Sequence, residues 1–222
     1  MRLTAPLPPS CHSKTDVSPS KNLLLYILPT TVRTTANGYA VLCRRADVQR
    51  AVSDFYAFFS ALVAAYRARG SYPMNMPVEI RVTGRDDAGD VGVRGAGVPV
   101  IGALHPRHDH PEWDTAVWFD VLTFPGTRDS VRFYRQLEQW FYSHYRSYAS
   151  VRPEWSKGWG YGTQSAWSDP QMLGRRIPQL NTVGRAAGDD WAWALRTLQR
   201  YDPHRVFTNA FLDRLMPAPA SR

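Results

Sequence analysis

The sequence has few cysteines and no long apolar run, and each shortage excludes a class of protein. Its two cysteines, Cys11 and Cys43, exclude a disulfide framework and a cysteine-based zinc motif. No run approaches the roughly 18 apolar residues of a membrane-spanning helix, so we expect no transmembrane segment. The N-terminus lacks the charged-then-apolar pattern of a secretory signal, so the sequence leaves the localisation unknown.

Lysine is also scarce, because arginine supplies most of the basic residues behind the net charge of +8. A strong positive charge is typical of proteins that bind nucleic acids. Here the arginines are scattered singly, with short pairs only at Arg44-Arg45 and Arg175-Arg176. The chain has no basic helix, zinc-finger spacing or RNP-like segment. We therefore expect no nucleic-acid partner.

Aromatic residues are abundant, with eight Trp and eleven Tyr in a chain that is 44% hydrophobic. Such side chains fill cores, and they also line pockets for bulky apolar ligands. Lys157 lies between Trp155 and Trp159, while the other two lysines lie near the N-terminus. In a chain that uses arginine almost everywhere, this lysine suggests a position that needs a compact ammonium group.

The segment from Val78 to Thr83 predicts a strand with one apolar face, because Val78, Ile80 and Val82 alternate with polar residues. The apolar face should lie on a core. The other face carries Glu79 and Arg81, about 7 Å apart along the strand. Two interpretations remain open: a salt bridge at the sheet surface, or the polar wall of a substrate cavity.

A second strand is predicted from Ala116 to Thr123, with Asp120 as its single charged residue. A carboxylate among Trp118 and Leu122 would be costly to bury unless it were paired. Arg81 on an adjacent strand is a natural partner. The alternative is an edge strand with Asp120 in water.

The remaining patterns indicate an α+β fold with an antiparallel sheet and helices packed on one face. Asn37-Gly38 predicts a hairpin turn between two strands. Apolar residues at helical spacing predict helices over 45–69 and 130–148, and a further helix is expected over 190–200. The apolar run from Asn22 to Leu28 predicts a buried strand.

Three histidines, His105, His108 and His110, lie close together in a proline-containing segment. Three such residues could ligate a metal. No cysteine or carboxylate stands at a matching spacing, so we favour a solvated loop and expect no metal site.

Taken together, the landmarks resemble the C-terminal part of the vanillyl-alcohol-oxidase-type flavoproteins. They are Glu79-x-Arg81, then Arg152-Pro-Glu-Trp-Ser-Lys157, then Tyr201-Asp-Pro followed by Val206-Phe-x-Asn209. The second motif has Glu154 and Ser156 where related sugar and lactone oxidases carry His and Gly. The stretches 22–81 and 113–159 look most like the substrate-binding domain of the type II cholesterol oxidases, which bind FAD covalently.

The resemblance implies a site that oxidises a sterol hydroxyl with FAD and O2. Arg81 would stabilise the developing alkoxide or ketone oxygen, and Glu79 would hold Arg81 in place. Asp120 falls where relatives place a polar residue, often Asn or His. Lys157 would lie near the flavin N1/C2 carbonyl, and Asn209 would help to close the flavin site.

The resemblance also implies a domain plan. Residues 1–20 are expected to be disordered, 21–180 to form the substrate-binding domain, and 181–222 to pack on a FAD-binding domain that this chain lacks. Catalysis would then need a separate FAD-binding chain. Two alternatives stay open: a non-enzymatic binder of sterols or other apolar ligands, and a fragment of a related sugar-alcohol or lactone oxidase.

Overall fold

A four-stranded antiparallel sheet organises the part of the chain that the computed structural model describes, residues 34–154 and 170–218. The strand order is β2-β3-β1-β4. The bounds of the strands are β1 Thr35–Cys43, β2 Val78–Gly84, β3 Thr115–Thr123 and β4 Ser150–Pro153. The predicted strand at 22–28 and the Lys157 segment lie outside the described residues.

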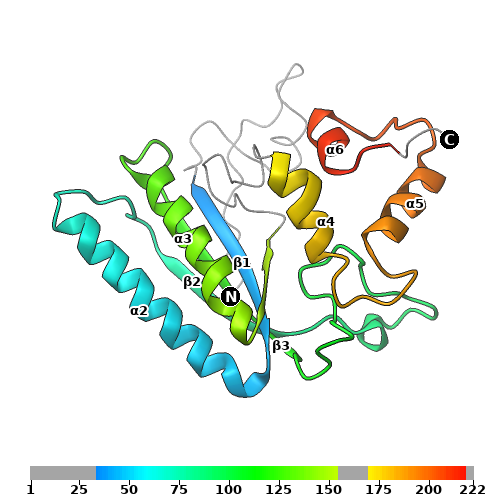
Figure 1. Ribbon diagram of the computed structural model, residues 1–222, viewed down its shortest axis with the longest axis horizontal. Helices are drawn as coiled ribbons and strands as arrows, with labels where there is room; N and C mark the ends of the chain where they lie inside the picture. The colour runs from blue at the N-terminus through cyan, green and yellow to red at the C-terminus, as the bar shows by residue number, and fades with distance from the viewer. Residues whose placement is uncertain (1–33, 155–169, 219–222) are drawn as a thin grey trace, which may run out of the picture. The chain divides into compact units, whose positions relative to one another are not determined.

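Helices cover one face of this sheet, as the sequence predicts (Figure 1). The α-helices are α2 Val48–Arg67, α3 Ser130–His144, α4 Ile177–Leu180, α5 Trp191–Tyr201 and α6 Ala210–Leu215. Short 3-10 turns occur at Arg45–Asp47, Ala88–Val91 and Tyr145–Ser147, and a π-helical turn over Met172–Arg176 leads into α4. None of the helices in the described ranges has both the length and the apolar content needed to cross a membrane.

The hairpin prediction at Asn37-Gly38 is wrong, because β1 runs through this dipeptide without a turn. Asn37 pairs with Val121 and Gly38 with Asp120 in the β1–β3 ladder. The residues that follow Gly38, from Tyr39 to Cys43, are fully buried. Burial of this apolar run between two neighbouring strands outweighs the local turn preference.

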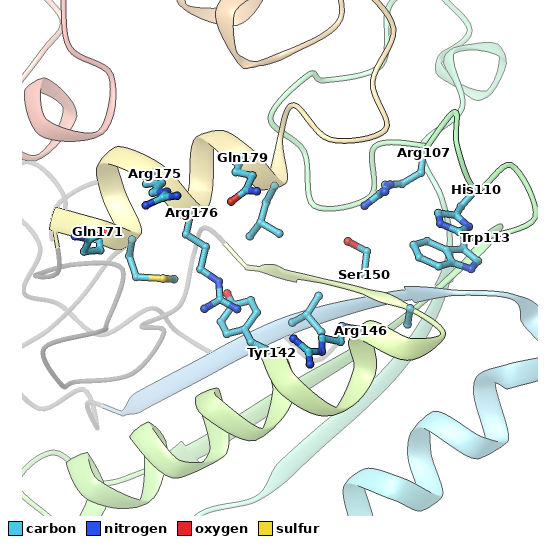
Figure 2. Close-up of a pocket in the computed structure, with 14 residues that line it drawn as sticks. Arg107, His110, Trp113, Tyr142, Arg146, Ser150, Gln171, Arg175, Arg176 and Gln179 are labelled. Atoms are coloured by element: carbon cyan, nitrogen blue, oxygen red, sulfur yellow. The ribbon is translucent and has the colours of Figure 1, made fainter.

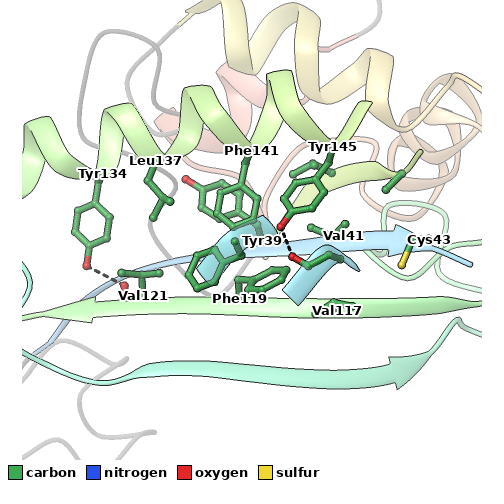
Figure 3. Close-up of a cluster of buried hydrophobic side chains, with 14 of the residues drawn as sticks. Tyr39, Val41, Cys43, Val117, Phe119, Val121, Tyr134, Leu137, Phe141 and Tyr145 are labelled. Carbon is green, nitrogen blue, oxygen red and sulfur yellow. Dashed lines mark hydrogen bonds between the residues drawn. The ribbon is translucent and has the colours of Figure 1, made fainter. Parts of the chain in front are cut away.

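The main core lies between the sheet and helices α2 and α3, and aromatic rings dominate it (Figure 3). Phe141 of α3 stacks on Tyr39 of β1 at a centroid distance of 4.5 Å, and Phe55 of α2 lies 4.5 Å from Phe119 of β3. The phenol of Tyr145 donates to the carbonyl of Ala51 at 2.7 Å, which joins the end of α3 to α2. Rings with this much area supply most of the apolar burial that holds the layers together.

Helix α2 ends where the sequence predicts. Gly70 adopts a φ of +67°, and the amide of Ser71 donates back to the carbonyl of Tyr66 at 3.1 Å. Glycine takes this left-handed conformation without steric cost and so closes the helix.

Strand β2 forms as predicted, but its apolar face is not on the core beyond Val78. Ile80 and Val82 are exposed, although they pair with the buried Phe119 and Val117 of β3. Strand β2 is an edge strand, and the buried core residues come from β1, β3, β4 and the helices. The alternation of apolar and polar residues therefore predicted the strand correctly, but it did not predict that most of the apolar side would be exposed.

The opposite face of the sheet is partly covered by the connection between β2 and β3. Arg152 of β4 is buried on this face, and its Nη1 donates to the carbonyls of Ala103 (3.0 Å) and His105 (2.6 Å). Burial lowers the pKa of the Arg152 guanidinium to about 10, so it stays charged at neutral pH. This one side chain ties the loop to the edge strand.

The C-terminal helices form a second apolar cluster of their own, joined to the loop at two points. His105 Nε2 lies 3.0 Å from Asp189 Oδ1, and the amide of His108 donates to the carbonyl of Gly184 at 2.7 Å. Gly184 has a φ of +71°, and a Cβ added there would lie 2.0 Å from Asp109 Oδ1. Only glycine fits this contact.

We expect Phe141→Ala to lower the free energy of unfolding by about 3–5 kcal/mol, because it leaves a cavity where several aromatic rings meet. Urea denaturation followed by fluorescence measures the change. Val131→Ala on the exposed side of α3 is the control and should stay within about 0.5 kcal/mol of the wild type. Equal effects of the two substitutions would contradict the assigned core.

Asp54 makes stability depend on pH. Burial alone would raise the pKa of its carboxyl, but hydrogen bonds from His144 (2.8 Å) and Tyr148 (2.9 Å) outweigh this and leave the pKa below its ordinary value. Because the folded state holds this proton less tightly than the unfolded state, Asp54 stabilises the fold above about pH 4. That contribution is lost as the pH falls through the lowered pKa.

We therefore expect the free energy of unfolding to fall less steeply between about pH 5 and about pH 3 in Asp54→Asn than in the wild type. Asp90→Asn removes an exposed carboxylate and should keep the wild-type slope. A wild-type slope in Asp54→Asn would rule out this role.

Candidate functional site

Three charged side chains meet on the face of the sheet that α2 and α3 leave open. Arg81 Nη2 of β2 contacts Asp120 Oδ2 of β3 and lies 3.5 Å from Glu154 Oε2, just after β4. Asp120 is fully buried, Glu154 is 17% exposed and Arg81 is 51% exposed. The cluster therefore has a buried anionic base and an accessible cation.

The strand register explains why these residues share one face. Glu79 of β2 pairs with Asp120, Asp120 pairs with Gly38 of β1, and Arg81 pairs with Trp118. Residues paired across a ladder point to the same side of the sheet. Residue 38 of β1 is a glycine, so no side chain lies on β1 between Asp120 and the residues that follow β4.

The predicted pairing of Arg81 with Asp120 is confirmed, and the alternative of Asp120 in water on an edge strand is wrong. Strand β3 lies between β2 and β1, where a carboxylate has no access to solvent. A buried carboxylate is stable only if it is paired or hydrogen-bonded. Arg81 meets that need.

Glu79 occupies the same face, but within the described part of the chain it forms no ion pair with Arg81. Arg81 is held instead by Asp120 and by Glu154. In the sequence, Glu154 stands out only as a departure from a motif. It comes two residues after Arg152, so a strand through Arg152 could have placed both side chains on one face. That inference needs the length of β4, which no local pattern gives.

Asn209 is the N-cap of α6. Its Oδ1 accepts hydrogen bonds from the amides of Phe211 (3.0 Å) and Leu212 (2.9 Å). This is the usual role of an asparagine at a helix start. Over the ranges described, the structure does not bring Asn209 into contact with Arg81, and Lys157 lies outside those ranges.

Two of the three histidines approach one carboxylate and the third lies apart from it, and the expected solvated loop is wrong for His105, which is buried. His105 is buried against Asp189, His110 stacks on Trp113 at 3.8 Å, and His108 lies 3.9 Å from Asp189 Oδ2. Among the residues described, no three His, Cys, Asp or Glu side chains converge as metal ligands would. Each histidine has a neighbour that accounts for its place.

The C-terminal segment exposes large apolar side chains. Tyr201, Val206 and Phe207 are all more than 70% exposed, next to an apolar cavity of about 490 Å³ between α5 and α6. Exposed apolar patches of this kind usually mark a surface that contacts another molecule or domain.

The chemistry available to the charged cluster is that of a fixed cation. A guanidinium has five N–H donors, and Arg81 uses only part of them on its two carboxylates. Its exposed side can donate to an oxygen atom that gains negative charge. Because the carboxylates hold it in place beforehand, such stabilisation needs no reorganisation.

Comparison with known proteins bears on the family and the fold of this chain. A family described as "Cholesterol oxidase, substrate-binding" matches residues 11–217. Among solved structures, a solvent-stable cholesterol oxidase is similar at 52% identity and a TM-score of 0.77, over 84% of this chain and 35% of that one. The crystal structure of cholesterol oxidase from B. sterolicum is similar at 43% identity and a TM-score of 0.79, over 86% and 35% of the two chains.

No curated protein gives a significant match. The chain spans about a third of the length of the two cholesterol oxidases to which it is similar. The match to the family nevertheless extends over nearly all of the chain, and the four-stranded antiparallel sheet with its helices is the fold of those structures. The chain therefore belongs to the cholesterol oxidase substrate-binding family.

Proposed function

We propose that this chain binds the sterol in a FAD-dependent oxidation of a 3β-hydroxysteroid such as cholesterol, and that it is inactive without a FAD-binding domain. FAD would supply the hydride acceptor for this oxidation, with O2 as the final electron acceptor and hydrogen peroxide as its product. The observation that carries the proposal is the half-exposed Arg81 guanidinium, held between Asp120 and Glu154.

Arg81 is the residue that would contact the substrate oxygen. As the hydroxyl loses its proton, the oxygen becomes negative, and a positioned guanidinium N–H stabilises it more than it stabilises the neutral alcohol. Asp120 is buried beneath Arg81 and is a positioning residue. Glu79 on the same face of the sheet and Glu154 beside Arg81 are carboxylates that could accept the proton of a hydroxyl bound at Arg81.

The residues present fit the substrate side of such a site better than the cofactor side. The donor set around Arg81 suits an oxyanion. The groups that would face the flavin are Lys157 and Asn209, and the Asn209 carbonyl is already used by the α6 cap. Its amide NH2 is the part that could donate to a cofactor.

The exposed apolar surface near Phe207 supports a partner for the C-terminal segment, residues 181–222. A FAD-binding domain would cover it. A fragment of a sugar-alcohol or lactone oxidase would use Arg81 in the same way, but on a polar substrate. Comparing turnover of a sterol with turnover of a sugar alcohol or lactone distinguishes the two functions.

We expect the purified 222-residue chain to show no flavin absorbance near 450 nm, before or after incubation with FAD and gel filtration. The reason is that the described residues beside Arg81 offer few donors for a dinucleotide, and an anion site elsewhere on the chain would not by itself retain FAD through gel filtration. Visible absorption spectroscopy measures this directly. A flavin spectrum that persists after gel filtration would contradict the need for a partner.

We expect Arg81→Ala to lower kcat/KM with cholesterol by about 100- to 1,000-fold once a FAD-binding partner is supplied, because the oxyanion loses its fixed donor. Peroxide release measures this rate. Cholesterol binding by the variant, followed by tryptophan fluorescence, should stay within about threefold because it rests mainly on apolar burial.

Arg85→Ala is a matched control from the same region, since Arg85 follows β2 and donates to the carbonyl of Pro111 instead of to the cluster. It should keep nearly full activity. If Arg81→Ala lost sterol affinity together with activity, Arg81 would contribute to binding as well as to catalysis, and the proposed division between apolar binding and polar catalysis would be wrong. Binding without turnover in the wild type would favour the non-enzymatic binder.

A further inference from the structure

A cavity of about 830 Å³ lies at the β4 edge of the sheet, between the C-terminal half of α3 and the π-helical turn that leads into α4 (Figure 2). Arg107, Arg146, Arg175 and Arg176 line it, and none of its lining residues is acidic. In the strand order, β4 is at the opposite edge from β2, which carries Arg81. The cluster around Arg81 reaches the end of β4 through Glu154, but none of its three residues lines this cavity, so the two sites share no side chain.

Most of the positive charge in this cavity is not balanced by carboxylates. Arg107 is paired with Asp109. Arg146, Arg175 and Arg176 have no carboxylate within ion-pair distance in the described ranges of the chain; Arg176 instead lies over the ring of Tyr142 at 3.8 Å. Glu138 lines an adjoining pocket with Arg146 and Arg176 and offsets part of their charge. The three guanidinium groups around one hollow still repel each other and attract an anion with more than one charge.

The local backbone and the neutral donors add to the same chemistry. The π-helical turn places the consecutive residues Arg175 and Arg176 both in the cavity wall, and such turns often occur at functional sites. The Tyr142 hydroxyl is buried beside Arg176 and has no hydrogen-bond partner in the part of the chain described.

We propose that this cavity binds a tetrahedral oxyanion, a phosphate or sulfate group, carried by a small organic molecule. Arg146, Arg175 and Arg176 would bind the anionic group, because a guanidinium matches phosphate and sulfate oxygens with two parallel N–H bonds. The apolar part of the wall, Val151, Met172 and Leu180, would contact the organic part of the ligand. The proposal does not depend on the oxidase function.

Calorimetric titration of the full 222-residue chain with inorganic pyrophosphate tests the site. We expect saturable 1:1 binding that weakens as sodium chloride is added. The double variant Arg175→Gln/Arg176→Gln should lose at least about tenfold in affinity for each arginine contact removed. Arg67→Gln, at the exposed end of α2, removes the same kind of charge outside the cavity and should stay within twofold.

The double variant Arg175→Lys/Arg176→Lys keeps both positive charges but removes the planar guanidinium groups that can donate two parallel hydrogen bonds. Affinity lost in this variant supports recognition by guanidinium geometry. Wild-type affinity in it, equal losses in Arg67→Gln, or no saturable binding to the wild type would each overturn the proposal. Because the substituted arginines are exposed, unchanged thermal unfolding should accompany the loss of binding.

The source of the group is identified by titrating phenyl phosphate and FAD in the same way. Phenyl phosphate that binds more tightly than inorganic phosphate, with the same dependence on Arg175 and Arg176, supports a free phosphate ester as the ligand. FAD that binds with this dependence identifies the dinucleotide pyrophosphate as the group recognised, and the oxyanion site itself is still supported.

Discussion

The aromatic contact between α3 and the two central strands is the constraint on which the rest of the structure depends. Phe141 meets Tyr39 and Phe119, and Tyr134 donates to the carbonyl of Val121 at 2.8 Å. These contacts commit one face of a short sheet to burial beneath helices. The other face is covered only in part, and there the charged residues Arg81 and Asp120 share the sheet with the buried Leu42 and Ala116.

On that face, the antiparallel register decides which charges meet. Asp120 is in the middle of the sheet and cannot reach water, so it must be paired from a neighbouring strand. Arg81 on the edge strand supplies the pair and keeps part of its guanidinium accessible. The edge position of β2 leaves Ile80 and Val82 exposed, and it also allows Arg81 to remain available to a ligand.

The sequence was sufficient for the parts of the fold that rest on periodicity. The helices over 48–67 and 130–144, strands β2 and β3, the Gly70 helix end and the Arg81–Asp120 pair all follow from local patterns and charge. The predicted turn at Asn37-Gly38 does not form, because the burial of a whole strand outweighs the turn preference of one dipeptide. Glu154 and the arginine-lined cavity could not be predicted, since each joins segments that are distant in the sequence and whose register no local pattern encodes.

The contact between Gly184 and the loop at 107–109 has a consequence for how the chain responds to its surroundings. The hydrogen bond joins two backbones, from the His108 amide to the Gly184 carbonyl at 2.7 Å, while the side chains of Arg107 and Asp109 pack against Gly184. Backbone amides do not titrate, and salt screens them little. The neighbouring Arg107–Asp109 ion pair is sensitive to both acid and salt. The C-terminal segment should therefore keep its attachment to the loop in conditions that loosen the charged groups beside it.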